Sequence, residues 1–572
     1  MISVAAEGDV HGASADSDAS AISRASGVAI VAADQQLAHA ISARLTINGA
    51  RSECTVTAAE GVTPQTLRSA NCVVYLPSLQ RRRTVPNIVE AENLFRECKE
   101  SGVGRLVLVA SAAIYGASFR NPGLISESSP LTKGTGIARE WKKLEDTAKA
   151  HFPSESQLVV LRCATVLSRS SATPVIQALT RRVTFVMPGH DPSIQLLDMN
   201  DLAQAVSCVV RQDAHGVFNV APDRVIPLRT VLRQSGVKCV PIPRTLLRIA
   251  RTALDGKRND CEEYARYSWT ISNENLKKFE FRPARSSAEA AMQFCRSSGK
   301  PSARVQQNGN FDDFGMDKTY IAAYGRTLFR FLSEWYWRIE VAGTEHIPRQ
   351  GRAVLVGIHR GFMPWDGVMA LHIILKNTGR YTRFLIHPGL VKFPFLANFM
   401  TKLGGIIACQ QNAAYVLERD ELLGVFPEGI HGAFVRYSQA YRLHDFHRDA
   451  FVKMALRHRA PIIPFVTVGS AEIFPILSKI KSRLWTKYSE WPAFPITPTF
   501  PWIPIPLPSK WHTCFLPPIH IENEYPPSAA TNTALVRRIS HEVKEKMQRA
   551  VDDMLERRRF IFFGSIFPGR TT

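Results

Sequence analysis

Two side chains that could share a proton, His359 and Asp366, lie seven residues apart in the second half of the chain. A histidine removes a proton from an alcohol near neutral pH when a carboxylate fixes its tautomer and stabilises the imidazolium that forms. On a continuous helix, seven positions separate the two side chains by about 10 Å along the axis. The pair therefore requires a turn, which Gly361 and Pro364 favour because both interrupt regular helix.

The residues on either side of the pair indicate a strand followed by a helix. The apolar, β-branched run 353–357 predicts a buried strand, and 367–375 predicts a helix. Enzymes of the α/β class often carry their functional residues on the loop between such elements. Taken alone, a histidine and an aspartate at this spacing are more often structural, so the catalytic interpretation depends on the rest of the chain.

Further blocks follow in a fixed order within about a hundred residues. They are Leu403 to Cys409 with Asn412, then Phe426-Pro427-Glu428-Gly429, then Ala460 to Pro464. Together with the segment around His359, they resemble the glycerolipid acyltransferase superfamily of the 1-acylglycerol-3-phosphate (PlsC-like) type. The closest likeness is to the branch with a widened spacing between histidine and aspartate. The resemblance covers roughly residues 317 to 572.

This resemblance implies that the protein is an acyltransferase acting in phospholipid biosynthesis and lipid metabolism. His359 would be the general base, held by Asp366, and would move a fatty acyl group from acyl-CoA or acyl carrier protein to a hydroxyl of a lysophospholipid or other glycerolipid. No metal and no cofactor is required for this reaction. The residues expected to bind substrate are Gly404, Gly405, Asn412, Phe426, Pro427, Glu428, Gly429 and His431. Glu428 would either bind a hydroxyl or hold its loop.

The chain departs from the family pattern at two places that concern the acceptor. The third block usually continues with an arginine thought to hold a phosphate through its bidentate geometry, and His431 stands there instead. Asn412 stands near the place of a second arginine. Arg436, Arg442 and Arg448 could compensate or be ordinary surface charge. A lysophospholipid, a neutral glyceride or another lipid alcohol therefore all remain open as acceptor.

The first half of the chain alternates short apolar strands with helical segments, which predicts a parallel sheet covered by helices on both faces. The segments 110–116, 161–167 and 216–221 give this half a resemblance to the NAD-dependent epimerase/dehydratase family, the extended short-chain dehydrogenase type. The expected fold is α/β throughout, a Rossmann-like domain fused to an α/β acyltransferase domain. The predicted divisions are a disordered tail 1–26, the Rossmann-like domain 27–296, a linker 297–316 and the acyltransferase domain 317–572.

The nucleotide-binding and catalytic positions of that family are altered here. Its three turn glycines correspond to Ala32, Gln35 and Ala38, so side chains stand where the backbone should approach a pyrophosphate. Ser111 matches the catalytic serine, but if Lys143 is the lysine of Tyr-x3-Lys, an arginine occupies the tyrosine position. We therefore interpret the domain as degenerate and NAD(P) binding as doubtful. The alternatives are an NAD(P)-dependent oxidoreductase or epimerase whose second half binds lipid, or a bifunctional enzyme.

Composition and charge limit the remaining possibilities. The chain has 572 residues with a net charge of +21, and from 317 onward 33 Lys+Arg face 20 Asp+Glu. A basic acyltransferase half suits an anionic membrane surface or an acidic acyl carrier. Without a recognisable nucleic-acid-binding motif, nucleic acid is not expected as a partner. Ten cysteines without a C-x-x-C pair indicate reduced thiols and no metal site.

No apolar run is long enough to predict a spanning helix, and residues 1–26 do not read as a signal peptide. We therefore expect a cytoplasmic protein, peripheral at the inner face of the membrane. Three segments could contact lipid or simply pack against the domain. They are the aromatic run 320–339, which predicts a helix, the run 485–511, whose prolines exclude a helix or a central strand, and the basic-aromatic run 557–563.

Overall fold

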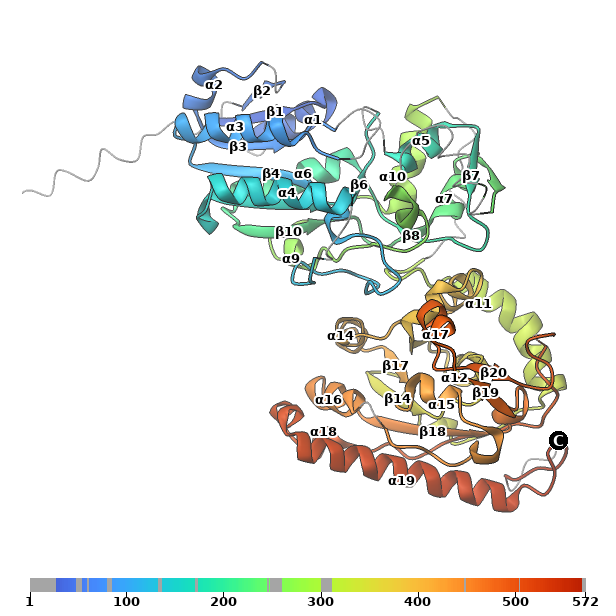
Figure 1. Ribbon diagram of the computed structural model, residues 1–572. Coiled ribbons are helices and arrows are strands. Elements are labelled where there is room, and N and C mark those ends of the chain that lie inside the picture. The colour runs from blue at the N-terminus through green and yellow to red at the C-terminus, as the bar shows by residue number, and fades with distance from the viewer. Residues whose placement is uncertain are drawn as a thin grey trace, which may run out of the picture.

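The computed structural model describes residues 27–47, 54–58, 61–79, 85–131, 136–169, 173–243, 246, 260–299, 311–446, 449–503 and 505–567. The predicted tail 1–26 and residues 300–310 of the predicted linker lie outside this part of the chain, as does Arg448. Two α/β sheets, one in each half, form the centres of two domains (Figure 1). The predicted fold class is confirmed.

The N-terminal domain is built on a six-stranded sheet in which every neighbouring pair is parallel. Its strand order is β10-β5-β4-β3-β1-β2, with β10 Gly216–Val220, β5 Leu158–Cys163, β4 Arg105–Ser111, β3 Ala70–Leu76, β1 Gly27–Ala32 and β2 Cys54–Thr57. The main helices on its faces are α1 Gln35–Ile47, α3 Ile88–Glu100, α4 Ile137–His151 and α6 Met199–Arg211. Strands that are buried on both faces explain the nearly continuous apolar runs in this half of the sequence.

A smaller lobe completes this domain beside the carboxyl ends of the strands (Figure 1). It has its own apolar core and three two-stranded pairs. The pairs are β6 Thr165–Val166 with β9 Leu196–Leu197, β7 Val183–Val186 with β12 Lys238–Pro241, and β8 Ser193–Ile194 with β11 Ile226–Pro227. Its helices are α5 Pro174–Thr180, α7 Leu228–Gln234 and α10 Ser287–Ser297.

The C-terminal domain contains a seven-stranded mixed sheet in which only the pair β18–β21 is antiparallel. Its order is β13-β21-β18-β14-β17-β15-β16, with β13 Glu340–Ala342, β21 His512–Phe515, β18 Ile462–Val468, β14 Ala353–Gly357, β17 Leu422–Val425, β15 Thr382–Ile386 and β16 Ile406–Ile407. The predicted strand over 353–357 is therefore the centre of the sheet.

Alternate residues of β14 face two separate cores, as the period of a strand requires. Val354 and Val356 pack with the helices α14 Gln410–Glu418, α16 Ala450–Arg457 and α19 Thr533–Arg557. Leu355 packs on the opposite face with α12 Trp365–Thr378 and with the irregular chain beyond β18. Helices therefore sandwich the strand that leads into the predicted histidine.

Of two segments singled out in the sequence, the proline-broken run contains more regular structure than expected, and the aromatic run is helical as expected. The proline-broken run 485–511 was expected to hold neither helix nor central strand, yet most of the helix α17 Arg483–Ser489 and the strand β20 Phe494–Ile496 lie in it. β20 pairs only with the short strand β19 Ser478–Ile480, so it is not central. The aromatic run begins with α11 Lys318–Tyr324 and continues in wide π-helical turns over Gly325–Phe329 and Leu332–Tyr336.

The two domains touch through specific polar contacts. The carbonyl of Gly189 accepts hydrogen bonds from the Phe395 amide at 2.9 Å and from Asn398 Nδ2 at 2.6 Å, next to the helix α13 Leu396–Lys402. Arg120 of the first domain forms an ion pair with Glu490 of the second at 2.7 Å. Among the described residues, no helix is both long and apolar enough to cross a membrane.

Candidate active site

The histidine and aspartate predicted from the sequence meet at the carboxyl end of β14. His359 Nδ1 lies 2.8 Å and 2.7 Å from the two carboxylate oxygens of Asp366. Gly361, with φ at +74°, turns the chain between them, and Asp366 opens α12 in its first turn, where the helix dipole stabilises a negative charge. The required turn is therefore present, and it brings together side chains that a continuous helix would hold apart.

Asp366 is buried and its oxygens are fully engaged. The backbone amide of Arg360 donates to Oδ2 at 2.8 Å, and the amide of Gly367 donates to Oδ1 at 2.8 Å. Because a carboxylate only accepts hydrogen bonds, Nδ1 of His359 must donate to it. The neutral imidazole then carries its lone pair on Nε2, which is the form a general base needs.

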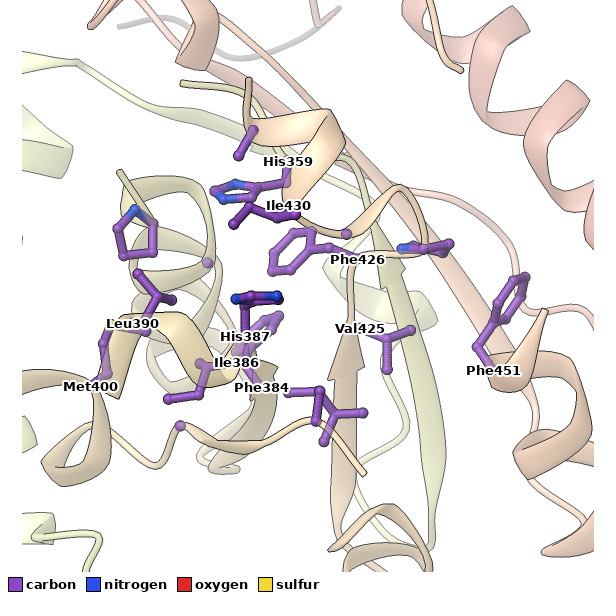
Figure 2. Close-up of a pocket in the computed structure, with 18 of the residues that line it drawn as sticks. His359, Phe384, Ile386, His387, Leu390, Met400, Val425, Phe426, Ile430 and Phe451 are labelled. Atoms are coloured by element: carbon purple, nitrogen blue, oxygen red, sulfur yellow. The ribbon is translucent and has the colours of Figure 1, made fainter. Parts of the chain in front are cut away.

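A cavity of about 300 Å³ opens directly beside His359. In Figure 2 the imidazole lies at the top of this cavity, with Ile430 and Phe426 just below and with Leu390, Ile386 and Met400 on one wall. Val425 and Phe451 lie on the opposite side (Figure 2). Aliphatic and aromatic side chains dominate, and the described lining contains no Asp, Glu, Lys or Arg. Such a lining suits a hydrocarbon chain.

Three of the four residues of the block 426–429 line this cavity, and the fourth does not. The Phe426 ring lies 5.2 Å from the His359 ring and stacks on Phe384 at 5.5 Å, and Gly429 adopts φ +57° at the start of α15 Gly429–Ala433. Glu428, which the sequence suggested as a substrate ligand, is buried and bound to the protein itself. Its Oε1 accepts from the amide of His444 at 2.9 Å.

The main partner of Glu428 is Arg360, a residue that sequence reasoning missed. Its Nη1 donates to Oε2 at 2.6 Å and its Nη2 to Oε1 at 3.1 Å, while further bonds reach the carbonyls of His359, Ala440 and Arg442. Arg360 therefore ties the loop that carries His359 to the block that contains Glu428. The sequence did contain a signal for this pair, because Arg360 follows the candidate base and lies between two apolar runs. An arginine buried in such a place requires an acidic partner.

The other predicted substrate-binding residues occupy different places. Gly405 lines the cavity, whereas Gly404 adopts φ +96° and packs close to Met316 and Arg383. Asn412 is buried beside the cavity lining and donates from Nδ2 to the carbonyl of Ile407 at 2.8 Å. His431 is exposed on α15, one residue after Ile430, which lines the cavity.

Sequence reasoning also missed three polar or thiol side chains in the cavity wall, namely His387, Cys409 and Gln410. His387 projects from the end of β15 toward the cavity centre, and its Nδ1 accepts a hydrogen bond from the amide of Gly389 at 3.1 Å (Figure 2). Cys409 lines the wall as well, and burial raises the pKa of its thiol. A protonated thiol is a weak nucleophile, so Cys409 is suited to packing. No group of three metal-ligating side chains occurs in the part of the chain that the structure describes.

The nucleotide-binding turn of the N-terminal domain follows β1. Asp34 Oδ1 accepts a hydrogen bond from the Leu37 amide at 3.2 Å at the start of α1, and its other carboxylate oxygen is bound by Ser168. Gln35 donates from Nε2 to the carbonyl of Ala32 at 3.2 Å, and Ala38 is fully buried. A carboxylate at the helix start repels the pyrophosphate that this position binds in dinucleotide-binding domains. These residues do not fit NAD(P).

The two predicted catalytic positions of that domain are used for local structure. Ser111 ends β4 and accepts a hydrogen bond from the Ala113 amide at 3.2 Å. Lys143 lies on the exposed side of α4 and pairs with Glu140 at 3.4 Å. In the interior, Arg162 forms a bidentate pair with Glu145 and donates to Tyr115, so the polar groups of this region are bound to each other.

Comparison with known proteins agrees with both domains. A family model described as Acyltransferase matches residues 338–468, and one described as NAD dependent epimerase/dehydratase family matches residues 80–221. An uncharacterized protein of Mycobacterium tuberculosis is 37% identical over 268 residues, which are 46% of this chain and 74% of that protein. An uncharacterized protein of Mycobacterium leprae is 34% identical over 283 residues, 48% of this chain and 76% of its own length.

A human protein named "DGAT1/2-independent enzyme synthesizing storage lipids" is 26% identical over 168 residues, covering 29% of this chain and 51% of that protein. Among solved structures, the human epimerase family protein SDR39U1 with NADPH aligns with 47% of this chain and 99% of its own, at 16% identity and a TM-score of 0.39. The dTDP-glucose 4,6-dehydratase of Bacillus anthracis with NAD aligns with 48% and 97%, at 11% identity and a TM-score of 0.37.

The mycobacterial relatives are matched over about three quarters of their length at more than 30% identity. Each family model covers part of one of the two sheets described above, one in each half. The chain therefore belongs to the same family as these mycobacterial proteins, and it joins an NAD-dependent epimerase/dehydratase-family domain to an acyltransferase domain.

Proposed function

We propose that the protein transfers a fatty acyl group from an acyl thioester, acyl-CoA or acyl carrier protein, to a hydroxyl of a glycerolipid at a membrane surface. The observation that carries this proposal is the His359–Asp366 pair at the edge of an uncharged, apolar cavity of about 300 Å³. A base held in one tautomer beside a site for hydrocarbon is what such a reaction requires. The acyltransferase family model covers both residues.

In the proposed reaction, Nε2 of His359 takes the proton of the acceptor hydroxyl as its oxygen attacks the thioester carbonyl. The carbon–sulfur bond then breaks, and the imidazolium returns its proton to the leaving thiolate. Asp366 stays ionised throughout and stabilises the imidazolium, because its oxygens already accept two backbone hydrogen bonds. The reaction forms no covalent enzyme intermediate and routes no step through a metal or NAD(P).

We further propose that the acceptor is an uncharged glycerolipid. The described cavity lining offers no cation to a phosphate, and Arg360, the arginine nearest the base in the sequence, is engaged by Glu428. His431 stands where the family resemblance places a phosphate-binding arginine. The human relative's name refers to storage lipids, which supports a neutral acceptor. Burying an unpaired phosphate in this lining would be strongly unfavourable.

An acyl-transfer assay tests both the mechanism and the neutral acceptor. It uses labelled acyl-CoA or acyl carrier protein as donor and diacylglycerol, monoacylglycerol or lysophosphatidate as acceptor, and the product is identified. We expect transfer to a neutral acceptor, loss of all transfer in His359→Ala, and a rate loss on the order of 10⁴-fold in Asp366→Asn, which disturbs the tautomer. His541→Ala, an exposed histidine of α19, is the control. Near-normal transfer by His359→Ala would refute the mechanism, and a preference for lysophosphatidate would refute only the neutral acceptor.

A further inference from the structure

Three segments that are distant in the sequence meet at one edge of the acyltransferase domain. They are 331–338, 502–510 and 560–563, and Figure 1 shows the helical run that begins at α11 on the same side as the C-terminal end. Hydrogen bonds join them: Tyr336 Oη to the Pro506 carbonyl at 2.6 Å, Arg338 Nη2 to the Phe562 carbonyl at 2.8 Å, and the Lys510 amide to the Ile561 carbonyl at 2.9 Å. The three segments therefore form one connected surface.

This surface exposes large apolar side chains from each segment. Trp502 exposes 85% of its area and Trp335 exposes 72%, although either ring would gain free energy from burial. Monomeric proteins rarely leave a large connected apolar patch in water unless it binds something. We call this surface the aromatic face and define it by Phe331, Trp335, Trp502, Ile505, Phe560 and Phe563.

Arginines lie among these rings. Arg330 and Arg559 are exposed, and the guanidinium of Arg338 lies 5.7 Å from the centre of the Phe563 ring. Aromatic rings together with arginines are typical of surfaces that lie in a membrane interface, with rings below the headgroups and cations at the phosphates. A second copy of the chain is a poorer partner, because a two-fold contact through this face would bring Arg330, Arg338 and Arg559 toward their own copies. Glu334, already paired with Arg330 at 2.9 Å, is the one carboxylate in these segments.

The aromatic face continues into the wall of the candidate active site. Trp502 comes two residues after Phe500, whose ring packs 4.7 Å from that of Phe362. Phe362 and Trp491, which also pack together, both line the cavity beside His359. A series of packed aromatic rings therefore links the segment that carries Trp502 to the cavity wall beside the base.

We propose that the aromatic face is the membrane-docking surface of this protein, with its rings inserted between lipids and its arginines bound to the phosphates of an anionic bilayer. Docking at this face supplies the acyltransferase site with its lipid substrate directly from the membrane. Only that purpose rests on the proposed acyl transfer, because binding to a bilayer does not depend on the reaction.

The test measures co-sedimentation of the full chain with vesicles of mixed phosphatidylcholine and phosphatidylglycerol, and with vesicles of phosphatidylcholine alone. The triple variant Trp335→Ser, Trp502→Ser, Phe560→Ser is compared with Phe185→Ser, which removes a ring of similar exposure from the other domain. We expect the triple variant to bind mixed vesicles at least about tenfold more weakly and Phe185→Ser to bind like the wild type. Binding should weaken as salt rises and be weaker on phosphatidylcholine alone.

Two further measurements separate docking from catalysis. His359→Ala should bind vesicles like the wild type while losing acyl transfer. Near-normal transfer by this variant, with intact binding, would refute the proposed function and leave the docking surface unaffected. The triple variant should keep wild-type transfer between short-chain, water-dispersed substrates, which also shows that it is folded. Equal vesicle binding by the triple variant and the wild type would overturn the proposal. The proposal would also be overturned if the wild type bound no vesicles and instead formed a dimer that the triple variant cannot form.

Discussion

Removing the charge of Arg360 is expected to destabilise the acyltransferase domain more than any exposed charge substitution. Arg360 exposes 1% of its surface and Glu428 exposes 3%, and they are joined by bonds of 2.6 Å and 3.1 Å. In Arg360→Met, Glu428 would keep its buried charge and lose its cation, with the His444 amide still donating to it. Breaking a buried pair from one side costs about 3–5 kcal/mol of unfolding free energy.

The double variant Arg360→Met, Glu428→Met removes both charges at once. It should cost about 2–3 kcal/mol less than the sum of the two single variants, because the second substitution removes an already unpaired charge. It should not be neutral, since the carbonyls of Ala440 and His359 lose their donor as well. The exposed ion pair Arg330–Glu334 provides the control, and Arg330→Met should cost less than about 1 kcal/mol.

Tryptophan fluorescence in urea is a suitable readout because seven of the nine tryptophans lie in the acyltransferase half. The two domains need not unfold together, so the transition reported by these tryptophans is the one to compare. Single substitutions that cost under about 1 kcal/mol, or a double variant that is additive within about 0.5 kcal/mol, would refute the buried-pair argument. Acyl transfer should fall as well, because the Arg360 side chain donates to the His359 carbonyl and ties that loop to Glu428.

Two other predictions concern the domain contact and pH. In Gly189→Val, at φ +73°, the Cβ atom would lie 2.4 Å from Pro394, so the substitution should lower the free energy of unfolding by about 1–3 kcal/mol and also lower acyl transfer. Gly102→Val, at φ +76° in open space, is the control and should show the cost of backbone strain alone. Equal effects of the two substitutions on unfolding and on acyl transfer would argue against a role for the domain contact. Burial lowers the pKa of His512 from 6.5 to about 4, so the free energy of unfolding should be largest above about pH 6.5 and fall by up to about 3 kcal/mol toward pH 4. Urea titrations at several pH values should show that His512→Gln flattens this dependence. An unchanged slope in that variant would contradict the prediction.

Several features were predictable because they depend on local pattern. The run 353–357 is apolar and β-branched and forms a central strand, and Gly361 and Pro364 provide the turn that the His359–Asp366 pair required. The residues Ala32, Gln35 and Ala38 likewise show from the sequence alone that the three turn glycines of the family are replaced. Each of these follows from the chemistry of a few neighbouring residues, whose backbone preferences can be read one position at a time.

Other features depend on which distant residues meet. Glu428 was expected to contact substrate or hold its loop, and it binds Arg360 across 68 positions of sequence. The run 485–511 reads as irregular because of its prolines, yet α17 begins at Arg483 just before it and Trp491 reaches the cavity wall. Neither result follows from local propensity, since packing against the rest of the domain decides where each side chain points.

The sequence by itself determined the two α/β halves, the candidate base and its carboxylate, and the altered nucleotide turn, because strand, helix and turn preferences act over a few residues. The tertiary structure alone decided that the base faces an uncharged cavity, that Glu428 is neutralised by Arg360, and that three distant segments share one exposed aromatic face. These depend on side chains brought together by the packing of the whole chain, which no short stretch of sequence encodes.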